Sequence, residues 1–506
     1  FMTSLMDRIQ ILEESGLFDE AWYLRHYPDV AQSGLSPAEH YVRIGETIGR
    51  KPRPDQAAEA ASEFLSACRT MATDTMEIDT ATRKAIADLR LFDEEWYRAQ
   101  HGVSLEDGED ALVHYIRHSA NNPVLDPSAL FSTRGYANAH PDTGSTSPLL
   151  HAVNSGVGEG RSLFSSDKVD KFLSDAKDVR CEEIDIILNS SKNAYIFIWE
   201  DGNFFFTEIA EYLVKYLSNK GYNSHIRKEV PDDIQDEDTI IVMAPHEFCV
   251  YGAGKDWDEG LLSRAVYLNT EQWHTGWFTL AYKFMIRSNK AIDINPASAC
   301  GLQHLGIRTA FLPILPLEGT PFRVDRTSIS PAFGQARHIR DLTYSDTLAN
   351  RPYDVLFVGA ANARREAALA SLAPVLADHD AFIHCPRFKG PVRAGNPDMM
   401  STSDFVQIAR NTKILLSIHQ GESRYFEWHR LFLFGIMEGC VVLTEPCIPN
   451  PFVKGGRDFL ECELKDMPER LRWLLETTEG QAEMNRARAN CDRFRNGDVD
   501  WMRAVA

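Results

Sequence analysis

The chain has 506 residues, which is too long for one hydrophobic core and predicts roughly two to four domains. A hydrophobic content of 44%, with 10% aromatic residues, is sufficient for well-packed globular domains. The formal net charge of −20 argues against a general nucleic-acid-binding protein, because phosphate binding requires a basic surface.

The nine cysteines are scattered singly and include no C-x-x-C pair. This pattern predicts neither a disulfide framework nor a zinc site, and it suits a reducing compartment. No apolar run approaches the roughly 20 residues that a membrane-spanning helix needs, and no signal peptide opens the chain. We therefore expect a soluble, cytoplasmic protein.

Internal repetition organises the first third of the chain. Residues 18–54 and 131–164 share a Pro-Asp pair, followed by Pro-x-x-His, four residues, Gly, three residues and Gly-Arg. The matching positions are Pro37, His40, Gly45, Gly49 and Arg50 in one copy, and Pro148, His151, Gly156, Gly160 and Arg161 in the other. A middle copy lacks the glycines but keeps Phe92, Trp96, Tyr97, His114 and Tyr115. Matched spacing at this many positions indicates a repeated structural unit.

Each repeat predicts two short helices. Ser36 and Pro37 form an N-cap and a first-turn proline, and a glycine ends that helix. The repeated histidines and aromatic residues could bind a sugar polymer, but we favour the interpretation that they pack the helices together. Residues 55–90 predict a connecting helix. We expect a helical repeat domain over 1–165 and a linker over 166–190.

The remaining chain alternates short apolar strands with helices. Strands are predicted at 195–199, 239–245, 264–272 and 309–316, and again at 354–358, 381–386, 413–419 and 439–446. Apolar strands separated by helices predict mainly parallel sheets that are covered on both faces. The predicted fold is α/β, with two Rossmann-like domains at 191–335 and 336–490, preceded by the all-α repeats and followed by a tail over 491–506.

Polar residues follow many of these strands. In parallel sheets of this kind, ligands bind beyond the carboxyl ends of the strands. The residues at those positions are Asp201, His246, Glu247, Glu271, Gly359 and His419. The strand, loop and helix over 358–366 could bind a diphosphate through backbone N–H groups, with Arg364 adding charge. The alternative is an ordinary strand-to-helix turn.

Two segments carry a family resemblance. "DVLFVGAANARRE" and "ILLSIHQGESRYFEWHRLFLFGIMEGCVVLTEP", in two tandem α/β halves, resemble the GT-B glycosyltransferases. The repeats resemble those found beside glycosyltransferase domains in bacterial surface-polysaccharide enzymes. The resemblance implies that the C-terminal half holds a nucleotide-sugar donor and the N-terminal half presents the acceptor. The chain departs from the retaining group-one pattern, because Phe434 stands where the second acid would be and Glu427 lies one residue after the first.

The resemblance implies a donor site in the second half, formed by Gly359, Arg364, His419, Glu427, His429 and Arg430. Glu427 would bind ribose hydroxyls and Arg430 the diphosphate, while Trp428 would line the base or the sugar. The alternative is a surface helix in which Glu427 and Arg430 pair at i,i+3 and Trp428 is in the core. We expect no metal ion and no separate cofactor, because arginines and helix N-termini can stabilise the leaving diphosphate.

An inverting transfer would need a base from the first half. Candidates are Glu271, His246 and Asp201, with Glu247 beside them. We favour Glu271, because the apolar residues 266–268 lead directly to it. The donor residues and the base can act together only if both sets of strand ends face one groove. A hinge is predicted near 313–321 and 328–334, and residues 496–506 could cross back to the first sheet.

The predicted function is a metal-independent glycosyltransferase. It would move a sugar from a nucleotide-sugar donor to a glycan, lipid-linked or protein acceptor at the cell surface, with no nucleic-acid partner. Peripheral association with the inner membrane and a homo-oligomer formed through the repeats are compatible with the sequence. The alternatives are a nucleotide-sugar epimerase of the same fold and a non-catalytic polysaccharide-binding or scaffold protein.

Overall fold

The computed structural model describes residues 5–14, 18–46, 50–53, 78–323, 346–388, 392–393, 395–499 and 501. The chain divides into two compact units: residues 1–83 with 140–144, and residues 84–139 with 145–506. Residues 55–77 of the predicted connecting helix, the predicted hinge loop at 328–334 and the final residues 502–506 lie outside the described residues. The predicted domain boundaries stay predictions.

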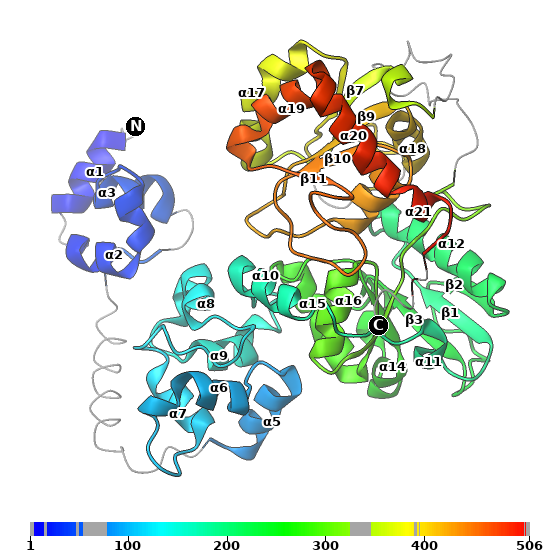
Figure 1. The fold of residues 1–506 in the computed structure, drawn as a ribbon. Coiled ribbons are helices and arrows are strands. Elements are labelled where there is room, and N and C mark those ends of the chain that lie inside the picture. Colours follow the sequence, from blue (N-terminus) through cyan, green and yellow to red (C-terminus); the bar gives the residue numbers. More distant parts are fainter. Residues whose placement is uncertain are drawn as a thin grey trace. The chain divides into compact units, whose positions relative to one another are not determined.

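The larger unit contains two parallel β-sheets, which confirms the predicted α/β fold class (Figure 1). The first sheet has the order β2-β1-β3-β4-β5-β6 and the second β11-β10-β9-β7-β8. The first-sheet strands are β1 (Asn193–Phe197), β2 (Asn223–Arg227), β3 (Thr239–Met243), β4 (Val266–Asn269), β5 (Lys290–Asp293) and β6 (Arg308–Phe311). The second-sheet strands are β7 (Tyr353–Val358), β8 (Ala381–His384), β9 (Thr412–Ser417), β10 (Val441–Thr444) and β11 (Leu460–Glu461).

The sequence missed three of these strands, β2, β5 and β11. Strand β2 is an edge strand with no fully buried residue, so it lacks an apolar run. Strand β5 has the sequence KAID and is too short to be distinguished by periodicity. Strand β11 has two residues.

Helices connect the parallel strands, as a parallel sheet requires. In the first half these are α12 (Phe204–Asn219), α13 (Pro245–Phe248), η6 (Ala253–Asp256), α14 (Glu259–Arg264), α15 (Gly276–Ser288) and α16 (Pro296–His304). In the second half they are α17 (Ala363–Ala377), α18 (Thr402–Arg410) and the π-helix η9 (Trp428–Ile436). In addition, η8 (Leu348–Asn350) precedes β7, and η10 (Leu464–Asp466), α19 (Met467–Glu476), α20 (Thr478–Asn490) and α21 (Asp492–Arg495) follow β11.

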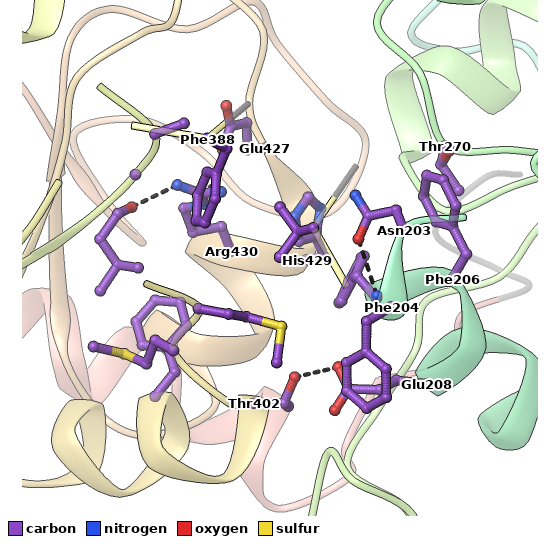
Figure 2. Close-up of a pocket in the computed structure, with 18 of the residues that line it drawn as sticks. Asn203, Phe204, Phe206, Glu208, Thr270, Phe388, Thr402, Glu427, His429 and Arg430 are labelled. Carbon is purple, nitrogen blue, oxygen red and sulfur yellow. Dashed lines mark hydrogen bonds and ion pairs between the residues drawn. The ribbon is translucent and has the colours of Figure 1, made fainter. Parts of the chain in front are cut away.

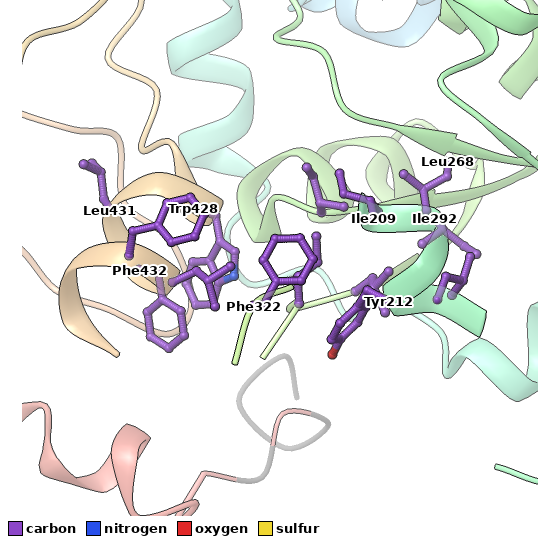
Figure 3. Close-up of a cluster of buried hydrophobic side chains, with 14 of the residues drawn as sticks. Ile209, Tyr212, Leu268, Ile292, Phe322, Trp428, Leu431 and Phe432 are labelled. Atoms are coloured by element: carbon purple, nitrogen blue, oxygen red, sulfur yellow. The ribbon is translucent and has the colours of Figure 1, made fainter. Parts of the chain in front are cut away.

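One buried hydrophobic cluster contains residues from both sheets. Figure 3 shows part of it, with Leu268 and Ile292 of the first sheet and Trp428, Leu431 and Phe432 of η9. Trp428 belongs to it: the ring stacks on Phe432 with centroids 4.0 Å apart, and Nε1 donates to the carbonyl of Pro313 at 2.9 Å. Because its one polar atom is used in this bond and the side chain is 1% exposed, Trp428 is a core residue. The expectation that it lines a base or sugar site is wrong.

The described part of the first 190 residues contains helices and, apart from an isolated β-bridge at Glu182, no β-structure. The helices are α1 (Leu5–Glu14), α2 (Glu20–His26), η1 (Pro28–Gln32), α3 (Pro37–His40), η2 (Tyr41–Gly45), α5 (Thr80–Leu89), α6 (Glu94–His101), η3 (Gly102–Ser104), α7 (Ala111–His118), α8 (Thr133–Ala139), η4 (Pro141–Thr143), α9 (Pro148–His151), η5 (Ala152–Gly156), α10 (Ser166–Asp175) and α11 (Ile184–Ile187). The predicted N-cap is confirmed, since the Ser36 hydroxyl accepts from the Glu39 N–H.

A tyrosine–histidine hydrogen bond recurs in every repeat. The tyrosine hydroxyl lies 3.2, 2.8 and 3.0 Å from the histidine Nδ1 in the pairs Tyr23–His40, Tyr97–His114 and Tyr136–His151. The glycine five residues after the histidine makes room for this hydroxyl in the first and third copies, because a Cβ there would overlap it. These contacts fit a packing role for the repeated residues.

Gly156→Ala should therefore destabilise the third repeat. The added methyl group would displace the Tyr136 hydroxyl and break its bond to His151. We expect a loss of about 1–3 kcal/mol, measured by urea unfolding. Gly158→Ala is the matched control, because its Cβ would meet nothing closer than a carbonyl at 3.6 Å. Equal stability of the two variants would contradict this account of the repeat.

Candidate active site

A cavity of about 590 Å³ lies at the carboxyl ends of the strands of both sheets (Figure 2). Segments that follow β1, β4 and β5 form one side of it, and segments that follow β7, β8 and β9 form the other. The residues that line it are Asn203, Phe204, Phe205, Phe206, Glu208, Thr270, Glu271, Gln272, Thr275, Trp277, Ile294, Val358, Gly359, Ala360, His384, Pro386, Phe388, Val392, Met399, Met400, Ser401, Thr402, Phe405, Gln420, Glu427, His429, Arg430 and Phe434.

The predicted site residues divide into two groups. Glu271, Gly359, Glu427, His429 and Arg430 all line this cavity, although they come from different sheets. The four that do not line it are Asp201, His246, Arg364 and His419. The carboxyl ends of the strands therefore mark the position of the cavity, but not every polar residue that follows a strand lines it.

Glu427 lies between two arginines at the cavity wall. Its carboxylate is 3.1 Å from Nε of Arg430 and 3.7 Å from Nη2 of Arg365. Burial alone would raise the pKa of this carboxyl, but attraction to the two guanidinium groups outweighs burial and lowers the pKa of Glu427 to about 2. The i,i+3 pair of Glu427 and Arg430, which the sequence suggested as an alternative on a surface helix, thus forms, and both residues line the cavity. Two guanidinium groups against one carboxylate leave one net positive charge.

His429 adds no charge to this cluster at neutral pH. Burial, followed by the nearby Arg430, lowers the pKa of His429 to about 4. Its ring lies 5.1 Å from that of Phe205, which comes from the opposite side of the cavity. A neutral imidazole at this position can accept or donate a hydrogen bond to a polar ligand.

Gly359 lets the arginines approach the backbone at the end of β7. A Cβ at this position would lie 3.0 Å from Nη1 of Arg365 and 3.1 Å from Nη1 of Arg430. Arg430 also donates to the carbonyl of Val358, one residue earlier. Any larger residue at position 359 would push the guanidinium groups away from the cavity wall.

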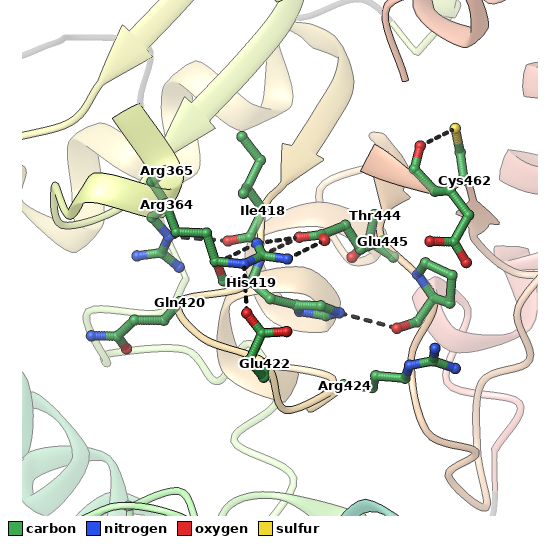
Figure 4. Close-up of polar contacts among 12 residues, drawn as sticks. Arg364, Arg365, Ile418, His419, Gln420, Glu422, Arg424, Thr444, Glu445 and Cys462 are labelled. Atoms are coloured by element: carbon green, nitrogen blue, oxygen red, sulfur yellow. Dashed lines mark hydrogen bonds and ion pairs between the residues drawn. The ribbon is translucent and has the colours of Figure 1, made fainter. Parts of the chain in front are cut away.

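Arg364 and His419 belong to a separate polar network next to the cavity (Figure 4). Arg364 makes a bidentate pair with Glu445, at 2.8 and 2.6 Å. Glu445 also accepts from the backbone N–H of His419 at 2.7 Å, and the His419 ring bonds to the carbonyl of Pro446. These side chains connect the ends of β9 and β10. Arg364 and His419 were predicted to bind the donor, but in this structure their hydrogen bonds go to Glu445 and Pro446.

Arg365, and not Arg364, is the arginine of α17 that lies beside Glu427, although Arg365 does not itself line the cavity. It is buried, donates to the carbonyls of Ile418 and Ala360, and faces Glu427. Adjacent residues of a helix point about 100° apart, so only one of the two arginines can face the cavity side of α17. No signal in the sequence distinguished them.

On the first-sheet side, Glu271 lies at the cavity and His246 lies behind it. His246 Nε2 is 3.3 Å from the Glu271 carboxylate, and burial lowers the pKa of the histidine. Asp201 is exposed and outside the cavity. Glu247 accepts from the backbone N–H of Asn203 at 3.1 Å, and burial raises its pKa to about 7. Of the predicted bases, Glu271 alone lines the cavity.

The sequence analysis missed the apolar part of the cavity. Phe204, Phe205 and Phe206 begin α12 and line it together with Phe388, Met399, Met400, Phe405 and Phe434. Three phenylalanines directly after a strand and its turn were the available signal. Glu208, one turn further along α12, accepts a hydrogen bond from Thr402 on the second-sheet side (Figure 2).

Glu208 should make the stability of the chain depend on pH. Burial raises the pKa of Glu208 from its ordinary value of 4.5 to about 7, so the folded state favours the neutral acid. The contribution of Glu208 to the free energy of unfolding should therefore be fully present below about pH 4.5 and be lost, by up to about 3 kcal/mol, as the pH rises through about 7. Glu208→Gln should remove this contribution, so that the slope of stability against pH in urea unfolding between about pH 5 and 8 is smaller than in the wild type. Glu237→Gln, at an exposed position before β3, should leave the slope nearly unchanged.

Among the described residues, no group of three or more His, Cys, Asp or Glu side chains is placed to hold a metal ion. No helix within the described ranges is long and apolar enough to cross a bilayer.

No protein-family model matches the sequence, and no curated protein matches it. Among solved structures, the chain is similar to an alpha1,3-fucosyltransferase with GDP-fucose, at 11% identity over 62% of this chain and 87% of that chain, with a TM-score of 0.30. It is also similar to an alpha-glucosyltransferase in complex with UDP-glucose and DNA containing an abasic site, at 10% identity over 61% of this chain and 95% of that chain, with a TM-score of 0.29. Because these TM-scores are low, the similarity says nothing by itself about what this chain binds.

Proposed function

We propose that the chain is a glycosyltransferase that moves a sugar from a nucleotide-sugar donor to a hydroxyl group of a glycan or other cell-surface acceptor. The observation that carries the proposal is the charge arrangement of the cavity. On the second-sheet side, Arg430 and Glu427 line the cavity, and the buried Arg365 beside Glu427 makes this cluster net positive. On the first-sheet side lies the carboxylate of Glu271. The positive cluster can bind a diphosphate, and the Glu271 carboxylate can deprotonate an acceptor hydroxyl.

The donor diphosphate would lie against Arg430 and the backbone at Gly359. Arg430 lines the cavity, and its charge is held in place by Glu427 and the Val358 carbonyl. A preorganised guanidinium stabilises the negative charge that develops on a leaving diphosphate. Glu427 is ionised, so it can accept hydrogen bonds from ribose or sugar hydroxyls. His429 is neutral and can contribute a further hydrogen bond.

The transfer replaces one C–O bond with another. The acceptor oxygen attacks the anomeric carbon, and the bond from that carbon to the diphosphate oxygen breaks. The nucleoside diphosphate leaves with the electron pair, and Glu271 takes the proton of the attacking hydroxyl. His246, 3.3 Å away, would hold the Glu271 carboxylate in orientation.

A thermal-shift panel with UDP, GDP and dTDP tests the donor site. A ligand that binds only the folded state raises the melting temperature, by an amount that grows with concentration over Kd. We expect one diphosphate to stabilise the wild type and to stabilise Arg430→Ala much less. Incubation of the matching nucleotide-sugar without acceptor then tests the alternatives, since an epimerase would change the sugar and a scaffold would bind no nucleotide. No stabilisation by any nucleoside diphosphate would overturn the proposed function.

A further inference from the structure

Helix α10 (Ser166–Asp175), within the predicted linker, contacts the two loops that carry the polar residues of the cavity. The first loop, residues 270–277, contains Glu271 and Gln272. The second, residues 420–430, contains Glu427 and ends in the first turn of η9, which carries His429 and Arg430. The loops share a long hydrogen bond, 3.5 Å between Gln272 Nε2 and the Glu427 carboxylate, and Gly421 lies near the His274 ring. Their relative placement therefore depends on what holds each of them.

The 420–430 loop is held by Asp170. This side chain accepts two hydrogen bonds, from the Ser423 hydroxyl at 2.7 Å and from the backbone N–H of Arg424 at 2.8 Å. Ser423 is buried, so no solvent replaces its partner if the carboxylate is lost. Hydrogen bonds from other elements also reach this loop: Asn295 donates to the carbonyl of Phe426 at 2.7 Å, Asn362 to that of Gln420 at 2.9 Å, and the Ile448 N–H to that of Arg424 at 2.8 Å. Asp170 is the contact that comes from α10.

The 270–277 loop is held by the same helix and by the segment before it. Phe172 of α10 packs against Trp273, with ring centroids 5.8 Å apart. The Ser162 hydroxyl, at the end of the third repeat, donates to the carbonyl of His274 at 2.6 Å. Trp273 is fully buried, and its Nε1 donates to Ser298 at 2.7 Å. This loop therefore cannot shift without disturbing α10.

Helix α10 is itself joined to the repeats and to the first sheet. Lys168 pairs with Asp126 at 2.7 Å, next to the ring of Trp96 in the middle repeat. On its other side Leu173 lies so close to Gly301 of α16 that a Cβ there would overlap it. The helix is thus fixed by the middle repeat and by the first sheet, while Asp170 points to the second-sheet loop.

We propose that Asp170 is a positioning residue, through which α10 holds the 420–430 loop at a fixed distance from the 270–277 loop. This contact keeps Arg430 and Glu427 in place opposite Glu271. The kinetic consequence of the contact rests on the proposed transferase function. The last repeat and α10 are then part of the site's support.

Hydrogen exchange tests the positioning role without reference to activity. In Asp170→Ala, amides of 420–430 should exchange about 10- to 100-fold faster than in the wild type, because two bonds that close this loop are lost. Asp170→Asn keeps one acceptor oxygen and should give an intermediate rate. Asp175→Asn is the matched control: it lies on the same helix in an exposed pair with Lys171 and should leave these amides unchanged. Amides of β7 should not change in any variant.

Kinetics then test the consequence for the site. Asp170→Asn should raise KM for the nucleotide-sugar several-fold while kcat falls less, because the donor residues are displaced rather than removed. If Asp170→Ala does not fold, the Asp170→Asn variant alone decides. If the amides of 420–430 exchanged in the Asp170 variants at the same rate as in Asp175→Asn, the proposal would be overturned. A wild type that binds no nucleotide would overturn the proposed function and leave the exchange result standing.

Discussion

Arg430→Ala should lower kcat/KM by about 30- to 1000-fold, which corresponds to about 2–4 kcal/mol of transition-state stabilisation. Arg430 is the cationic side chain that lines the cavity beside Gly359, and its position is fixed by Glu427 and the Val358 carbonyl. Removal of the guanidinium would leave the leaving diphosphate without a preorganised partner. The measurement is steady-state kinetics with the nucleotide-sugar selected by the thermal-shift panel.

Two variants make the result specific. Arg430→Lys should restore the activity only in part, because an ammonium group cannot bind a diphosphate with two parallel hydrogen bonds. Arg424→Ala removes an exposed arginine from the same loop outside the cavity, keeps the N–H that bonds to Asp170, and should have little effect. If Arg430→Ala turned over as fast as Arg424→Ala, Arg430 would have no part in the site.

Glu271→Gln should lower kcat by about 10²- to 10⁴-fold, the range expected for loss of a general base. Glutamine keeps the size of the side chain and can still bond to His246, but it cannot take the proton of an acceptor hydroxyl. Binding of the nucleoside diphosphate should be unaffected, because Arg430 and Glu427 are on the other side of the cavity. In this variant, transfer activity with acceptor should therefore be lost, while the thermal shift caused by the nucleoside diphosphate should stay as in the wild type.

Glu247→Gln is the matched control for that experiment. Glu247 follows β3, the strand next to β4, but it lies outside the cavity. Its carboxylate accepts a hydrogen bond from the Asn203 N–H. We expect Glu247→Gln to retain most of the activity. The opposite ranking, with Glu247→Gln inactive and Glu271→Gln active, would move the base from Glu271 to Glu247.

Much of the fold could be predicted from short apolar runs. The strands at β1, β3, β4, β7, β9 and β10 consist largely of buried Ile, Val, Leu and aromatic residues, and this composition follows from burial on both faces of a parallel sheet. Because parallel strands end at one edge, the polar residues that follow them were expected to converge. Glu271, Gly359, Glu427, His429 and Arg430 do so around one cavity.

What the sequence by itself determined about this protein is therefore local: apolar strands, the helix start at Ser36, the spacing of the repeats and the edge of the sheets where polar side chains gather. Only the tertiary structure decided which of two adjacent arginines faces Glu427, because that depends on the rotation of α17 against β9 and β10. It likewise placed Trp428 in the core, Glu208 against Thr402, and Asp170 against a loop about 250 residues away. Contacts between distant segments depend on how the two sheets and the repeats pack, and no periodicity or motif within one segment encodes them.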